Sequence, residues 1–109
     1  MPRSKNSYSI TLKDRTLTIL PPKELAYDLV PRIKAEVETA MEQPDLGEVV
    51  VDLSRTTFMD SSGISVLILI QKMASQSGIT VRLDRPCPEI SKILHLVGLA
   101  EFFHIPGQS

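Results

Sequence analysis

The stretch "VVVDLSRTTFMDSSGISVLI", residues 49–68, decides the fold that this sequence predicts. It opens with the almost unbroken apolar run "EVVVDL", residues 48–53, which is typical of a central strand covered on both faces. Residues 61–78 are ambiguous, because "ISVLILI" is rich in β-branched residues that favour strands. A helix is favoured by the cap-type residues Asp60, Ser61 and Ser62, by the helix formers in "QKMASQ" and by the stop at Gly78. The stretch therefore predicts a buried strand, a loop at 54–60 and a long helix.

The residues before this stretch predict a hairpin and a first helix. Residues 7–14 and 15–20 alternate apolar and polar side chains, as half-buried strands do, although "KDRT" lacks an Asn-Gly type of turn. Residues 23–44 then place apolar side chains at three- and four-residue spacing. We expect Asp28 to cap this helix, with Pro31 in its first turn, where a missing N–H costs little.

The residues after it predict a further strand and helix. Residues 79–84 alternate like a strand, and 88–98 form a short helix that ends at Gly98. We expect its inward side chains to be Ile90, Ile93, Leu94 and Val97. Residues 99–105 are compatible with a last short strand. Strands that alternate with helices predict an α/β domain with a sheet covered by helices.

Length and composition predict one compact domain. The chain has 109 residues, of which 42% are hydrophobic and 23% charged, as in ordinary globular proteins. We expect flexible ends at 1–6 and 106–109.

The longest apolar stretch, 64–70, is far shorter than the roughly 20 residues that cross a bilayer, and we expect no signal peptide. The formal net charge of −1 argues against direct nucleic-acid binding, and the single cysteine, Cys87, excludes an internal disulfide and fits a reducing compartment.

The sequence contains no recognisable catalytic or metal-binding motif. "MDSSG" is not the G-x-S-x-G elbow of hydrolases, and no glycine-rich phosphate loop occurs. His95 and His104 are too isolated for a metal site, and His95 is expected to be partly buried or at a boundary. Nothing places either histidine beside Cys87. We therefore expect no enzyme activity, no metal and no cofactor.

Two compatible interpretations of "MDSSG" remain open. Asp60 or Ser61 caps the following helix, which contributes about 1 kcal/mol. Alternatively, one hydroxyl here accepts a phosphate, because a helix N-terminus carries free N–H groups and partial positive charge. The added charge would leave the fold intact and still disrupt an interface.

The helix that follows is hydrophobic all round. Two opposite faces are expected, one with Ile64, Leu67 and Ile68 and the other with Val66, Leu69, Ile70 and Met73. Either neighbouring helices cover both faces, or one face is a docking surface that begins beside Ser61.

At this point the chain resembles a STAS domain, specifically a stand-alone anti-sigma-factor antagonist. Residues 49–68 match the family's apolar strand, its D/N-L-x-x-x-x-F-M-D-S-S/T-G loop and its apolar helix. "ISKILHLVGLAEFFHI", residues 90–105, is similar to the family's closing helix. "KELA", residues 23–26, occupies the position of the family's G-E-L-D, with Lys23 and Ala26 in place of Gly and Asp.

The resemblance implies a single STAS domain with a mixed sheet of roughly four to five strands and about three to four helices. It implies a cytoplasmic bacterial regulator that binds an anti-sigma factor, usually also a serine kinase, and so releases a sigma factor. The kinase would phosphorylate Ser61, and a PP2C-type phosphatase would restore it. The remaining implied roles are loop shaping by Asp60, a neighbouring hydroxyl at Ser62, close approach at Gly63, and partner contacts by these residues and by Met59, Val66, Leu69 and Met73. The alternative is a non-switched STAS subunit of a stressosome-like or transport complex.

Overall fold

The computed structural model describes residues 7–98, which form an α/β domain. The helices are α1 (Val30–Ala40), α2 (Ser61–Gln76) and α3 (Pro88–Leu96). The strands are β1 (Ser9–Lys13), β2 (Thr16–Leu20), β3 (Glu24–Leu25), β4 (Glu48–Asp52), β5 (Phe58–Met59) and β6 (Thr80–Asp84). The ambiguous segment after Asp60 is thus a helix, as predicted.

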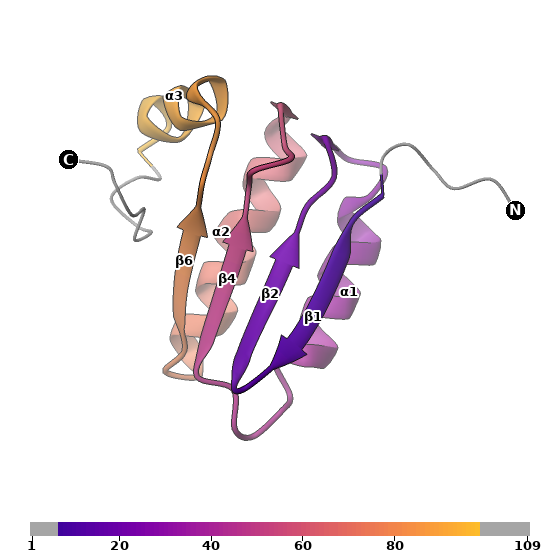
Figure 1. Ribbon diagram of the computed structural model, residues 1–109, viewed down its shortest axis with the longest axis vertical. Helices are drawn as coiled ribbons and strands as arrows, with labels where there is room; N and C mark the ends of the chain where they lie inside the picture. Colours follow the sequence, from indigo (N-terminus) through magenta and orange to yellow (C-terminus); the bar gives the residue numbers. More distant parts are fainter. Residues whose placement is uncertain (1–6, 99–109) are drawn as a thin grey trace, which may run out of the picture.

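The main sheet is mixed and has the order β1-β2-β4-β6. β1 is antiparallel to β2, whereas β2, β4 and β6 are parallel and are connected through α1 and α2. Both of these helices lie on the same face of the sheet (Figure 1). The expected mixed sheet is confirmed.

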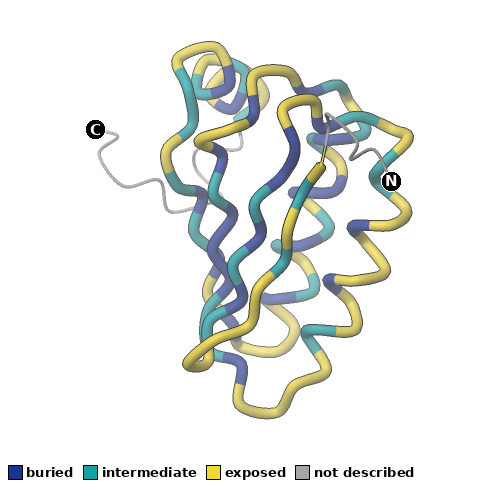
Figure 2. Tube along the Cα trace, turned by 45° about the vertical axis from the view of Figure 1, so that its right-hand side comes forward, coloured by how far each residue is buried: buried dark blue, intermediate teal, exposed yellow. Residues whose placement is uncertain are grey.

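The core lies between this sheet face and the two helices. Alternate residues of the strands point into it, because successive side chains of a strand face opposite sides. Buried segments of the strands and of the inner sides of α1 and α2 face one another, while the outer side of α1 is exposed (Figure 2). The buried core side chains include Leu17, Ile19, Val49, Val51, Val81 and Leu83 of the sheet and Ile33, Val37, Val66, Leu67 and Ile70 of the helices.

The β1–β2 hairpin closes through two residues in the left-handed region. Asp14 has φ 52° and Arg15 has φ 67°, the backbone that two-residue hairpin loops favour and that usually selects Asn-Gly. Other contacts hold Arg15 in place. Its Nε donates to the Asp45 carbonyl at 2.8 Å, and its own carbonyl accepts the Gly47 N–H at 2.8 Å.

The structure corrects three expectations. The N-cap of α1 is Leu29 rather than Asp28, and no side chain accepts a hydrogen bond there, although Pro31 does lie at the start of the helix. Val97 is 49% exposed instead of inward, because α3 ends at Leu96. Residues 24–25, which precede the expected cap and were assigned no strand, form strand β3. The proposed last strand at 99–105 and the expected flexible ends lie outside the described residues.

Candidate functional site

The candidate site lies at the end of the sheet where the parallel strands β2, β4 and β6 finish (Figure 1). Here the short strands β3 and β5 form a separate parallel pair, with Leu25 opposite Met59. The N–H groups of Thr57 and Phe58 both donate to the Lys23 carbonyl, at 2.8 and 3.1 Å. This pairing brings the "KELA" segment against the residues that lead into α2.

Asp60 is the N-cap of α2 and also binds the "KELA" side of the site. Its Oδ1 accepts the Gly63 N–H at 3.0 Å, which satisfies one of the donors left free at a helix start. Its Oδ2 accepts the backbone N–H of Tyr27 at 3.3 Å. One carboxylate therefore fixes both the beginning of α2 and the segment between β3 and α1.

We expect Asp60→Ala to lower the free energy of unfolding by about 1 to 2 kcal/mol, because it removes a helix cap. Urea denaturation followed by circular dichroism measures this change. Ser61→Ala is the matched control, since Ser61 is exposed and does not cap the helix. Equal stability of Asp60→Ala and Ser61→Ala would contradict the role of Asp60.

Ser61 is the first residue of α2 and is exposed, whereas Ser62 is half-buried. Gly63, the next residue, is buried against the β3 backbone. A Cβ atom at Gly63 would lie 2.4 Å from the Leu25 carbonyl oxygen and 2.7 Å from Cγ of Met59. Glycine therefore permits the close approach of α2 to β3 that holds Ser61 at the surface.

Only one side of α2 is buried. The residues on this buried side match neither of the two apolar faces that were expected from the sequence. Val66 and Leu67, expected on opposite faces, both lie in the core, as do Gly63, Ile70 and Ala74. The exposed side carries Ser61, Ser65, Ile68 and Lys72. Leu69 and Met73 are half-buried at its margin.

Met59 and Val66, expected to contact a partner, are instead core residues. They are only 5% and 2% exposed, because β5 packs against α2 and α3 and the inner side of α2 packs against the sheet. These two side chains and the buried Gly63 therefore offer little accessible surface to a partner.

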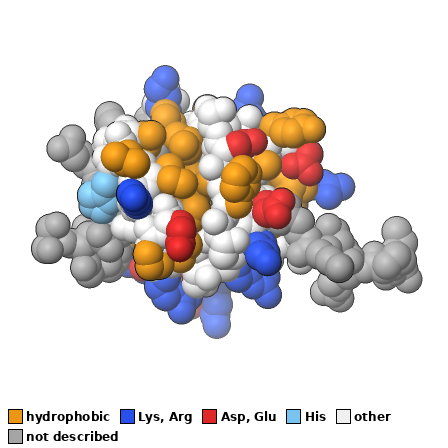
Figure 3. Space-filling model, turned by 90° about the horizontal axis from the view of Figure 1, so that it is seen from above, with side chains coloured by type: hydrophobic (Ala, Val, Ile, Leu, Met, Phe, Trp, Pro, Cys, Tyr) orange, Lys and Arg blue, Asp and Glu red, His pale blue; other side chains and the backbone are white. Residues whose placement is uncertain are grey.

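Exposed apolar side chains lie on elements adjoining Ser61. Tyr27 is 73% exposed, Phe58 is 51% exposed and Ile68 is also exposed. Figure 3, which looks onto this end of the molecule, shows hydrophobic side chains spread over it with several acidic side chains among them. Neither Tyr27 nor Phe58 was predicted as a site residue from the sequence. The signal that could have identified both is an aromatic residue in a predicted loop, where its side chain can be exposed.

Two further residues hold the loop between β4 and β5. The buried Thr56 donates through Oγ1 to the Pro22 carbonyl at 2.9 Å. Asp52 accepts the Ser54 N–H at 3.0 Å and pairs with Arg85. Burial raises the pKa of Asp52, but the hydrogen bonds with Ser54 and the Arg85 ion pair outweigh it, so the pKa lies below its usual range. Asp52 is the first residue of the family's loop motif, whereas Thr56 lies at one of its variable positions and had no signal in the sequence.

Other candidate groups lie apart from this arrangement. Cys87 is half-buried and donates through Sγ to the Thr56 carbonyl at 3.5 Å. His95 is exposed rather than partly buried, and its Nδ1 lies 2.8 Å from the Ser91 carbonyl oxygen. Within residues 7–98, no three His, Cys, Asp or Glu side chains are grouped as metal ligands would be. In the same range, every helix is too short or too polar to cross a membrane.

Known structures share this fold. The anti-sigma factor antagonist SpoIIAA in its unphosphorylated form is 23% identical with a TM-score of 0.81, over 94% of this chain and 90% of that one. The Bacillus cell fate determinant SpoIIAA in its phosphorylated form is also 23% identical, with a TM-score of 0.75, over 94% and 93%. A sulfate transporter family protein from Wolinella succinogenes is 14% identical with a TM-score of 0.72, over 84% and 73%. The family model of the STAS domain matches residues 7–107, so the chain belongs to the STAS domain family.

Proposed function

We propose that this protein is an anti-sigma-factor antagonist whose binding is switched by phosphorylation of Ser61. In its unphosphorylated form it binds an anti-sigma factor that is also a serine kinase, and so releases a sigma factor. The observation that carries the proposal is the exposed Ser61 at the first position of α2, directly after the Asp60 cap. The likeness to both forms of SpoIIAA supports it.

The position of Ser61 suits a reversible charge. The first N–H groups of a helix have no partner within the helix and carry partial positive charge, which stabilises a phosphate. The Asp60 carboxylate accepts hydrogen bonds from Gly63 and Tyr27, so the cap does not depend on the Ser61 hydroxyl. A phosphate of about −1.5 to −2 charge can therefore form without unfolding the domain.

We place the partner surface around Ser61, on the exposed side of α2 and the adjoining loops. Exposed aromatic side chains supply much of the binding energy in protein interfaces. Tyr27, Phe58 and Ile68 provide such apolar groups here, with Leu69 and Met73 at the margin. Asp60 and Ser62 shape this surface from within. The proposed activity is binding, with no catalysis and no cofactor, in the cytoplasm, and a PP2C-type phosphatase would reverse the modification.

Phosphorylation by the cognate anti-sigma factor tests the proposal. The purified protein is incubated with that kinase and Mg-ATP, and phosphopeptides are mapped by mass spectrometry. We expect one phosphate on the wild type and on Ser62→Ala, and none on Ser61→Ala, because only Ser61 is both exposed and first in the helix. Phosphate on Ser62, or phosphate that persists in Ser61→Ala, would refute the site.

The second candidate function is a non-switched subunit of a larger assembly. The likeness to the Wolinella succinogenes sulfate transporter family protein favours it. In that case, Asp60 and Ser61 only begin a helix. The expected result is then an unphosphorylated chain that copurifies with a permease or an ATPase rather than with a kinase.

A further inference from the structure

Among residues 7–98, Thr56 is the one buried residue with a polar or charged side chain. It lies in the loop between β4 and β5, and its exposed fraction is 0%. Burying a hydroxyl is unfavourable unless the hydroxyl forms a hydrogen bond in the interior. The contacts that compensate this cost therefore indicate what Thr56 does in the structure.

Thr56 joins three segments of the chain. Its Oγ1 donates to the Pro22 carbonyl at 2.9 Å, and its N–H donates to the Leu53 carbonyl at 3.1 Å. Its own carbonyl accepts a hydrogen bond from Sγ of Cys87 at 3.5 Å. Pro22 and Cys87 lie 34 and 31 positions away in the sequence. Thr56 therefore ties the entrance of β5 to the segment before β3 and to the start of α3.

The pair of strands that follows needs such an anchor. β3 and β5 have two residues each, and strand pairs this short have little stability of their own. The carbonyl after that of Pro22, which belongs to Lys23, accepts the N–H groups of the two residues after Thr56. Beyond the other end of the pair, the Asp60 carboxylate accepts the Tyr27 N–H. Side-chain hydrogen bonds therefore hold the pair at both ends, with Thr56 at the entrance and Asp60 at the exit.

The anchor at the entrance is stiff on both sides. Pro21 and Pro22 follow β2 directly and are both buried. The proline ring restricts φ to one narrow range, so the Pro22 carbonyl belongs to a rigid segment. Threonine is β-branched and has few side-chain rotamers. A hydrogen bond between two such groups defines one position of β5 relative to the end of β2.

We propose that Thr56 is a positioning residue for the phosphorylation of Ser61, an inference that rests on the proposed function. The Thr56 hydroxyl bonds to Pro22, and residues 57–60 connect Thr56 to Ser61. Thr56 fixes where β5 begins, and β5 leads directly into the Asp60 cap. The cap in turn determines where Ser61 stands at the start of α2.

Phosphoryl transfer depends strongly on the position of the acceptor oxygen. The Ser61 oxygen forms a bond to the γ-phosphorus of ATP, the bond from that phosphorus to the ADP oxygen breaks, and the hydroxyl proton passes to a base of the kinase. A misplacement of about 1 Å that originates far from the chemistry can lower a rate about a hundredfold. The exposed side of α2, which we propose to bind the kinase, is held by the core instead. A loosened β5 should therefore lower kcat more than it raises KM.

The kinetics of phosphorylation by the cognate anti-sigma factor and Mg-ATP test the proposal. Thr56→Val removes the hydroxyl and keeps the branched shape of the side chain. We expect kcat for Ser61 to fall about tenfold in this variant, with KM changed less than about threefold. Thr56→Ser retains the hydroxyl and should recover most of the wild-type rate. Circular dichroism at the assay temperature verifies that both variants are folded.

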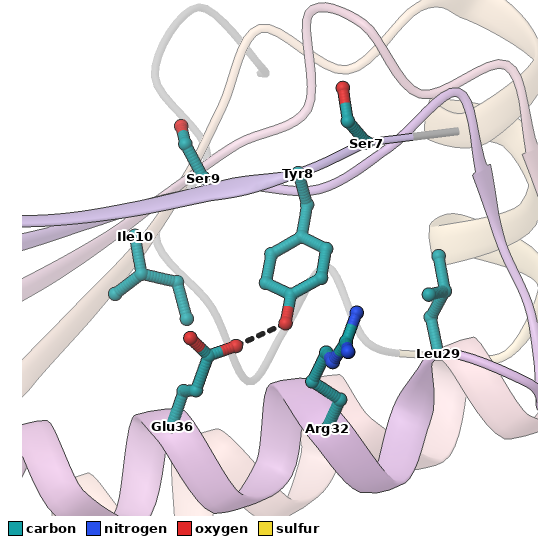
Figure 4. A pocket seen from close by; sticks show the side chains of 7 residues that line it. All are labelled: Ser7, Tyr8, Ser9, Ile10, Leu29, Arg32 and Glu36. Carbon is teal, nitrogen blue, oxygen red and sulfur yellow. Dashed lines mark hydrogen bonds between the residues drawn. The ribbon is translucent and has the colours of Figure 1, made fainter. Parts of the chain in front are cut away.

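Tyr8→Phe is the matched control, because it also removes one hydroxyl that donates a hydrogen bond. The Tyr8 hydroxyl donates to the Glu36 carboxylate across a cavity of about 500 Å³ between β1 and α1 (Figure 4). Burial and the neighbouring Glu36 raise the pKa of Tyr8 to about 12, so the hydroxyl stays protonated at neutral pH. The residues that line this cavity lie outside β3, β5 and α2. Tyr8→Phe should therefore be phosphorylated at the wild-type rate.

Amide hydrogen exchange tests the anchor without a kinase. In Thr56→Val, the N–H groups of Thr57 and Phe58 should exchange about tenfold faster than in the wild type, while those that pair β2 with β4 stay protected. Unchanged exchange of the Thr57 and Phe58 N–H groups would overturn the role of Thr56. A kcat of Thr56→Val as high as that of Tyr8→Phe, or a kcat of Thr56→Ser as low as that of Thr56→Val, would also overturn it. A wild type that acquires no phosphate on Ser61 would instead refute the proposed function, and the role of Thr56 in phosphorylation with it.

Discussion

Replacing Ser61 by aspartate is expected to weaken binding of the anti-sigma factor at least tenfold, about 1.4 kcal/mol. The new carboxylate would stand at the exposed first position of α2, in the middle of the proposed partner surface. Binding would bury it beside the apolar groups of Tyr27 and Phe58, and an unpaired charge that loses water is costly. Titration calorimetry with the purified anti-sigma factor measures the affinity.

The same substitution should leave the fold unchanged. An acidic residue in the first turn of a helix is stabilising rather than disruptive, by roughly 0.3 to 1 kcal/mol. Thermal unfolding of Ser61→Asp should therefore match that of the wild type or exceed it slightly. This separates loss of binding from loss of structure.

Two controls make the result specific to the site. Ser61→Ala removes the hydroxyl without adding charge and should bind like the wild type. Ser75→Asp adds the same charge to an exposed position near the other end of α2 and should also bind normally. Equal affinity of Ser61→Asp and wild type would refute the electrostatic switch, and equal loss in Ser75→Asp would assign the effect to net charge.

The main elements of the fold were predictable because their signals are local. Alternation marked β2 and β6, and cap residues before a long segment marked α2 as a helix despite its β-branched residues. β3 and β5 were not predictable. Each strand has only two residues, too few to show an alternation of apolar and polar side chains. The two strands form because the N–H groups of Thr57 and Phe58 donate hydrogen bonds to the carbonyl of Lys23, which is distant in the sequence.

The candidate site was predictable in its residue types and less so in its surface. Helix-start chemistry predicted a cap by Asp60 or Ser61, and the structure assigns that cap to Asp60. The buried side of α2 did not follow, because a helix that is apolar all round contains no pattern that distinguishes Val66 from Ile68. The hydrogen bond from Tyr27 to Asp60 depends on tertiary pairing and had no sequence signal.

Gly63→Ala is expected to lower the free energy of unfolding by about 3 kcal/mol, in the upper range for an overpacked core. Local propensity predicts the opposite sign, since alanine within a helix is favoured over glycine by about 1 kcal/mol. The tertiary contact decides, because the added Cβ would lie 2.4 Å from the Leu25 carbonyl oxygen. A backbone atom of a paired strand cannot rotate away as a side chain does, so α2 and β3 must separate.

Gly47→Ala is the matched control for this substitution. Its added Cβ would come no closer than 3.4 Å to the end of the flexible Arg15 side chain, so its stability should stay near that of the wild type. Urea unfolding of both variants gives the two free energies.

The Ser61 surface depends on the same contact, because α2 begins where β3 and β5 hold it. Gly63→Ala should therefore also bind the anti-sigma factor more weakly than the wild type, even at temperatures where the variant is still folded. A Gly63→Ala protein as stable as Gly47→Ala would mean that β3 yields to the new methyl group, and that the close approach of α2 to Leu25 does not fix the position of Ser61.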